Sequence, residues 1–71
     1  MKRFLIIVEK TSTGYSAYPP DVPGCIATGS TRKIVQKRIR DAIQFHVEGL
    51  RLEGYKLPKA NSYSAYIEVP A

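Results

Sequence analysis

The feature that most constrains this sequence is a proline-rich corner at residues 19–24. Three prolines and one glycine fall within these six positions. Because proline fixes φ and lacks a backbone N–H, this segment suits neither a helix nor a central strand of a sheet. Pro23-Gly24 favours a type II turn, since glycine tolerates the positive φ that this turn requires. We therefore expect a rigid corner between two short strands. Its turn motif comprises Pro20, Asp21, Pro23 and Gly24.

Hydrophobic patterns divide the rest of the chain into short strands and one helix. The first ten residues have a short apolar centre between charged ends, which is typical of a strand. A helical period begins at Arg32, after Ser30 or Thr31 as the capping residue, and continues to about Glu53. The predicted elements are strands at 1–10, 15–18, 25–28 and 64–69 and a helix at 32–53.

The periodicity of the predicted helix indicates which side faces the sheet. At 100° per residue, six side chains share one stripe, and three apolar residues form a flanking stripe. The main stripe consists of Val35, Ile39, Ala42, Ile43, His46 and Leu50. The flanking stripe consists of Ile34, Phe45 and Leu52.

The order β-β-β-α-β predicts an α+β fold in two layers, an antiparallel-rich sheet with one helix on one face. A single helix covers only one face of such a sheet. The other face would then expose apolar side chains, which small domains seldom leave in water. We expect this face to contact a partner or a second copy in a homo-oligomer, either a dimer or a tetramer. Its predicted residues are Leu5, Ile7, Tyr18 and Tyr66.

The length and composition predict a single small domain in the cytoplasm. A chain of 71 residues buries a limited core. One cysteine forms no internal disulfide, and the five apolar residues after Lys2-Arg3 are too few for a signal peptide. No apolar run is long enough to cross a bilayer, so we expect no membrane association.

Few residues suggest chemistry. His46 is the single histidine, and it is either a core residue or a lone proton carrier or metal ligand; a metal site needs three or four ligands. Cys25 fits a small buried residue better than a nucleophile. Glu9, Asp21 and Glu68 are too dispersed in sequence for a two-metal nuclease, and Asp21 suits bonding to its own turn. We therefore expect no enzyme activity and no cofactor. The five tyrosines suit base stacking or, more commonly, interfaces.

The net charge of +5 is concentrated on the predicted helix and its exit. Residues 30–59 contain eight basic and three acidic side chains. This excess is consistent with a solvated face, with nucleic-acid binding, or with an acidic protein partner. The candidate nucleic-acid face comprises Lys33, Lys37, Arg40 and Arg51.

Taken together, several of these stretches resemble the HicB family of antitoxins and its small single-domain relatives. The resemblance extends over nearly the whole chain. It rests on Gly14-Tyr15-Ser16-Ala17, Pro20-Asp21-Val22-Pro23-Gly24-Cys25, Gly29-Ser30-Thr31 and Ile67-Glu68-Val69-Pro70-Ala71.

The resemblance implies a non-enzymatic antitoxin that occludes a HicA-type mRNA-interferase toxin, on a HicB-like, partial RNase H-like fold. The alternative is a solitary module that binds nucleic acid through the basic helix face. HicA-type toxins are small basic proteins, and family members often carry acids where this chain has Arg32 and Lys33. Many HicB proteins add a C-terminal DNA-binding domain. We expect none here, and a single HicB-like domain at residues 1–71.

Overall fold

Three short strands form an antiparallel sheet in the computed structural model, which describes residues 2–71. Strand β1 (Ile7–Lys10) pairs with β2 (Tyr15–Tyr18), and β2 pairs with β3 (Ala27–Gly29), in the order β1-β2-β3. A turn joins β1 to β2, in which the Thr11 N–H donates to the Gly14 carbonyl at 2.8 Å. Gly14 lies so close to the Gly29 carbonyl that a Cβ atom would collide with it. The hairpin turn therefore requires glycine at this position.

The sequence predicted a strand at residues 1–10, whereas β1 begins at Ile7; residue 1 lies outside the described residues. The reason lies in its partner, because Ile7 pairs with Tyr18, the last residue of β2. The next partner along β2 would be Pro19, which has no N–H to donate. Residues 4–6 therefore continue beyond the hairpin without a ladder, although their side chains remain half-buried.

The predicted corner follows β2 directly. The Val22 N–H donates to the Pro19 carbonyl at 3.1 Å, which closes a tight turn. Val22 is buried, and Gly24 adopts a φ of +84°, in the left-handed region that favours glycine. The expected positive φ at Gly24 is confirmed.

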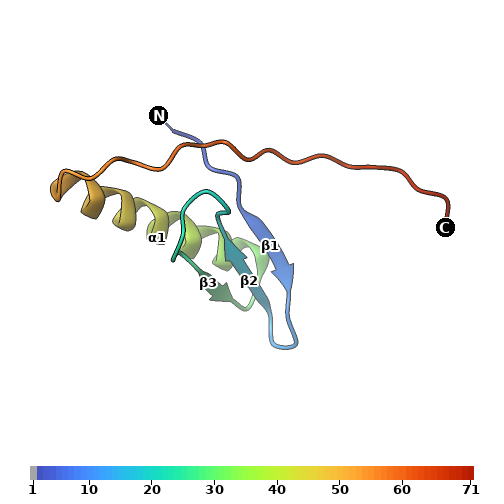
Figure 1. Cartoon of the computed structure of the whole chain (residues 1–71). Coiled ribbons are helices and arrows are strands. Elements are labelled where there is room, and N and C mark those ends of the chain that lie inside the picture. Colours follow the sequence, from blue (N-terminus) through green and yellow to red (C-terminus); the bar gives the residue numbers. More distant parts are fainter. Residues whose placement is uncertain (1) are drawn as a thin grey trace.

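Helix α1 (Arg32–Leu52) packs on one face of the sheet, as Figure 1 shows. It begins at Thr31, whose hydroxyl accepts from the Ile34 N–H at 3.1 Å. The buried core consists of Ala17, Val35 and Ile39, with Ala42 and Ile43 packed against it. The predicted sheet-facing stripe is confirmed at these helical positions, and the expected α+β, two-layer fold is confirmed.

The second half of α1 extends beyond the three strands (Figure 1). No strand therefore packs against the flanking stripe in this half of the helix. Phe45 and Leu52 of that stripe are 82% and 88% exposed. His46 and Leu50, on the main stripe, are half-buried.

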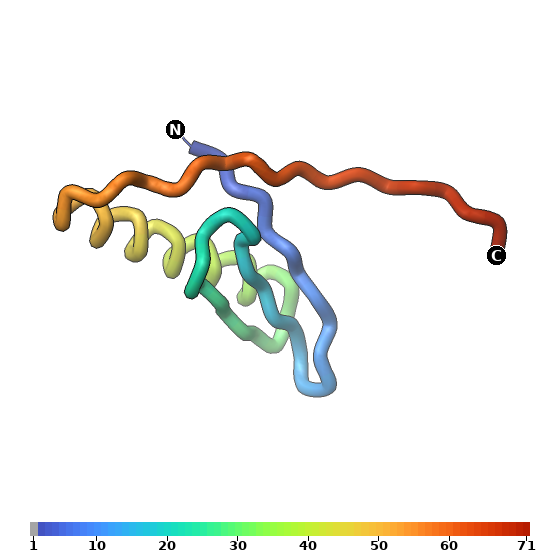
Figure 2. The backbone as a smooth tube through the Cα atoms, viewed as in Figure 1, coloured from blue at the N-terminus to red at the C-terminus, as the bar shows by residue number. Residues whose placement is uncertain are grey.

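The last segment differs from the prediction. Residues 64–69, expected as a fourth strand, are extended but pair with no other strand. We call residues 56–71 the C-terminal arm. Figure 2 shows the arm passing the N-terminal segment and then leading away from the sheet and helix. The radius of gyration is accordingly 14.0 Å, against about 11 Å for a compact chain of this length.

Candidate interaction surfaces

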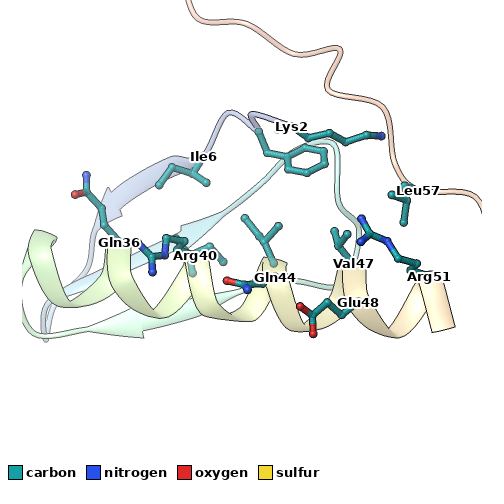
Figure 3. A pocket seen from close by; sticks show the side chains of 12 residues that line it. Lys2, Ile6, Gln36, Arg40, Gln44, Val47, Glu48, Arg51 and Leu57 are labelled. Atoms are coloured by element: carbon teal, nitrogen blue, oxygen red, sulfur yellow. The ribbon is translucent and has the colours of Figure 1, made fainter.

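A groove lies between the N-terminal segment and α1, beside the outer edge of β1 (Figure 3). Its volume is about 980 Å³. Apolar side chains from both walls line it, together with polar and charged side chains from α1. We call it the β1–α1 groove. The apolar lining is Phe4, Ile6, Ile39, Ile43, Val47 and Leu57.

The polar lining of the groove includes two of the four residues of the candidate nucleic-acid face. Arg40 and Arg51 both line the groove, near Gln44 and Glu48 (Figure 3). Lys37 does not line the groove; it pairs with Asp41 at 3.1 Å, and the Arg40 guanidinium lies 4.0 Å from the same exposed carboxylate. Lys33 is exposed in the first turn of α1. The structure therefore divides the four basic residues between the groove and the solvent side.

The sheet face opposite α1 carries two of the predicted partner-binding residues as a direct pair. Ala17 faces the core, so its neighbour Tyr18 faces away from the helix, opposite Ile7. Tyr18 is 39% exposed, and Ile7 and Leu5 are half-buried. Tyr66 lies on the C-terminal arm, fully exposed, and does not join them within one chain.

Asp21 connects the corner to the C-terminal arm. Its carboxylate accepts from the backbone N–H groups of Asn61 and Ser62, at 2.9 and 2.8 Å, and from the Ser62 hydroxyl at 2.8 Å. The Ser62 N–H contributes most to lowering the pKa of Asp21 below its usual value, and the Ser62 hydroxyl adds to it. The expectation that Asp21 bonds its own turn is wrong; its partners lie 40 and 41 residues away. Its neighbours in the turn motif, Pro20, Pro23 and Gly24, are exposed.

The remaining candidates for chemistry are the Cys25 thiol and the possible metal ligands. Burial raises the pKa of the Cys25 thiol, which lies 4.0 Å from the Ala42 carbonyl. Among residues 2–71, no group of three or more His, Cys, Asp or Glu side chains is placed to hold a metal ion. Within the same residues, no helix has both the length and the hydropathy that a membrane crossing requires.

The sequence indicated neither the groove nor the arm's attachment. Val47 and Leu57 stand 10 residues apart in separate segments, so no local period relates them. Asn61-Ser62 reads simply as a polar connection. The helical position of Val47, next to the main stripe, was the one available signal.

The sequence matches a protein-family model and known proteins. The family model described as "HicB_like antitoxin of bacterial toxin-antitoxin system" matches residues 4–71. The chain is 40% identical over 65 residues to an uncharacterized 14.9 kDa protein of Haemophilus phage HP1, covering 92% of this chain and 49% of that protein. It is 31% identical to a UPF0150 protein of Thermoplasma acidophilum, covering 84% of this chain and 88% of that one.

A solved structure is similar as well. A chain in the HicA3 and HicB3 toxin–antitoxin complex aligns with a TM-score of 0.66 and 36% identity, over 78% of this chain and 64% of that chain. This chain thus spans about half the length of the phage relative and less than two thirds of the solved one. On the strength of the family match along residues 4–71, the chain belongs to the HicB-like antitoxins of bacterial toxin–antitoxin systems.

Proposed function

We propose that this protein is an antitoxin that binds a HicA-type mRNA-interferase toxin and occludes it without catalysis. The observation that carries the proposal is the likeness, at 36% identity, to a chain solved within a toxin–antitoxin complex. Such a protein works by covering a surface of its partner, so it needs an exposed, partly apolar face rather than a catalytic centre.

The sheet face opposite α1 suits this role. Ile7 and Tyr18 form a cross-strand pair on it, and tyrosine is enriched at protein interfaces because it combines a large apolar area with a polar tip. Farther along the same face, Glu9 lies opposite Ser16, which lies opposite Thr28. The strand residues on this face thus include an acid and no base.

Charge favours the sheet face over the helix. The toxins of this family are basic, and the first turn of α1 contains no acid. A basic partner would be repelled by Lys33 and its neighbours on α1. Approach from the opposite face places the sheet between the two positive surfaces, which reduces that repulsion.

The proposal extends to where and how the protein acts. We expect it to meet its toxin in the cytoplasm, where mRNA is cleaved. Of the acids outside α1, Asp21 is occupied by the arm, Glu9 lies on β1, Glu53 is the residue that caps the end of α1, and Glu68 lies on the arm. Occlusion needs none of them as a catalyst.

The test is rescue of growth. A HicA-type toxin is expressed with the wild-type protein, with Tyr18→Asp, or with the control Lys33→Glu. Wild type and Lys33→Glu should restore growth and co-purify with the toxin after nuclease treatment. Tyr18→Asp should do neither, while remaining folded by circular dichroism.

Two outcomes would overturn the proposal. The first is failure of the wild-type protein to bind or neutralise any such toxin. The second is recovery of nucleic acid alone, lost with rising salt and with Lys33→Glu, since this is the behaviour of a phosphate-binding module. Rescue by Tyr18→Asp as effectively as by wild type would reject the sheet face as the site.

A further inference from the structure

The outer half of the C-terminal arm, residues 63–71, is extended and pairs with none of the strands β1 to β3. Tyr66 is fully exposed, and Ile67 and Val69 are 81% and 71% exposed. Within the described residues, no backbone hydrogen bond is formed by positions 63–71. Apolar side chains alternate along it, with Ala65, Ile67 and Val69 on one side. An exposed segment with this pattern is expected to pair with the edge of a sheet.

Strand β1 offers the edge. Within the described residues β1 is hydrogen-bonded to β2 alone, so its outer edge is free. The opposite edge of the sheet is shorter, because β3 has three residues, and its Thr28 carbonyl already accepts from Arg38 at 3.0 Å. The segment leading through β1, residues 4–10, is the longer template.

The β1–α1 groove lies beside that free edge and has the matching chemistry. Phe4 and Ile6 line it from the strand side, and Ile43 and Val47 line it from α1. In a strand added to β1, every second side chain would point toward these residues of the groove. Ala65, Ile67 and Val69 would then cover the exposed part of α1.

The arm lines the groove of its own chain at Leu57 and is directed away from it beyond that residue. The Lys2 ammonium donates to the Pro58 carbonyl at 2.9 Å, and the Asp21 carboxylate accepts from the N–H groups of Asn61 and Ser62. Figures 1 and 2 show the last part of the arm leading away from the sheet and the helix. Nine residues remain after Ser62, and at about 3.3 Å each they reach roughly 30 Å. This is ample to cover the seven residues at positions 4–10 of another molecule.

We propose that two copies of this chain exchange their C-terminal arms, so that residues 63–71 of each form the fourth strand beside β1 of the other. The exchange is reciprocal, as expected for a two-fold symmetric dimer. It fills the β1–α1 groove and pairs both free edges. It also places Tyr66 on the face that carries Leu5, Ile7 and Tyr18 of the second copy. The inference does not depend on toxin binding.

Disulfide trapping tests the exchange directly. In a Cys25→Ala background, a tagged chain carrying Ile67→Cys is refolded together with an untagged chain carrying Val47→Cys and then oxidised. Exchange predicts a disulfide between the two different chains. The same experiment is repeated with cysteine at Ala65 and Val69, so that the result does not depend on one register.

Control variants use the opposite side of the arm. Cysteine at Ser64, Tyr66 or Glu68 points away from α1 in the proposed strand and should give little of the disulfide to Val47→Cys. Equal trapping by both sets would overturn the proposal. So would a chain carrying both Ile67→Cys and Val47→Cys that forms its disulfide only within itself, since that is a fourth strand added in cis.

Ultracentrifugation of the unmodified protein gives a second test. We expect a dimer at micromolar concentration. Ile67→Asp should raise the dissociation constant of the dimer by at least about tenfold, because the exchange would then bury the Asp carboxylate in the apolar groove of the second copy. Tyr66→Asp is the matched control on the outward side. A wild-type monomer, or a dimer unaffected by Ile67→Asp, would overturn the proposal; the growth-rescue experiment stands separately from either result.

Discussion

Asp21 holds Ser62 by two hydrogen bonds, one from the backbone N–H and one from the side-chain hydroxyl, both at 2.8 Å. The two residues are 41 positions apart in the sequence. The contact joins the proline-rich corner to the C-terminal arm, immediately before residues 63–71. It therefore sets the direction in which residues 63–71 leave the molecule.

Asp21→Asn should release the arm. Asparagine keeps the size of the side chain but loses the negative charge that strengthens its bonds to Asn61 and Ser62. We expect trypsin to cleave after Lys59 several times faster than in wild type, measured by mass spectrometry. Asp41→Asn is the control, because it removes the same charge from an exposed helical pair. Unchanged protection in Asp21→Asn would contradict the assigned role.

The attachment should also weaken in acid. Hydrogen bonds from Ser62 lower the pKa of Asp21 from its ordinary value of 3.8, so the folded protein favours the carboxylate. Its stabilising contribution is thus fully present above pH 3.8 and is lost as pH falls through the lowered value. The amide NMR signals of Asn61 and Ser62 should report this as a transition with a midpoint below pH 3.8.

The Asp21→Asn variant supplies the control for that titration. Its Asn61 and Ser62 amides should show no transition in the same pH range. A wild-type midpoint at or above the ordinary aspartate value would mean that Asp21 gains nothing from these partners.

The sequence predicted α1 and the hairpin well because both depend on local signals. The stripe containing Val35 and Ile39 and the cap at Thr31 lie within a few residues of the elements they specify. The turn at Gly24 is likewise local. The extended backbone at residues 64–69 was also foreseen from alternation, but alternation does not say which edge a strand joins.

The groove and the Asp21 attachment depend on segments that are distant in sequence. Asp21 was expected to bond within its own turn, which is the common use of aspartate in a proline-rich corner. It binds the arm instead, because an Asx turn would use the N–H two residues on, and that residue is Pro23, which has none. No pattern in a single sequence relates Leu57 to Phe4 across the groove.

Ile39 should be the most sensitive core position of α1. It is buried against Ala17 and Val35 and also lines the floor of the groove. Ile39→Ala should lower the free energy of unfolding by about 2–5 kcal/mol, from lost burial and the cavity left behind. Urea denaturation at a fixed protein concentration measures this change. Phe45→Ala, at an 82% exposed position, is the control and should change it little; equal losses would contradict the core assignment.

Thr31→Ala should destabilise the start of α1. The alanine removes the hydroxyl that accepts from the Ile34 N–H and leaves that donor without its cap. We expect a loss of about 1 kcal/mol in urea denaturation. Thr31→Ser keeps the hydroxyl and should restore most of the loss, whereas equal losses in both variants would argue against capping.

Cys25 should react slowly in the folded protein. Burial raises the pKa of its thiol, and the sulfur lies against the Ala42 carbonyl, so little thiolate is present at neutral pH. Ellman's reagent at pH 8 should modify the native protein at least about tenfold more slowly than the urea-unfolded chain, because both the thiolate fraction and access are reduced. Ile39→Ala should accelerate modification if reaction requires opening of the core that Cys25 packs against. A native rate equal to the unfolded rate would show an accessible, reactive cysteine and would reopen the question of its function.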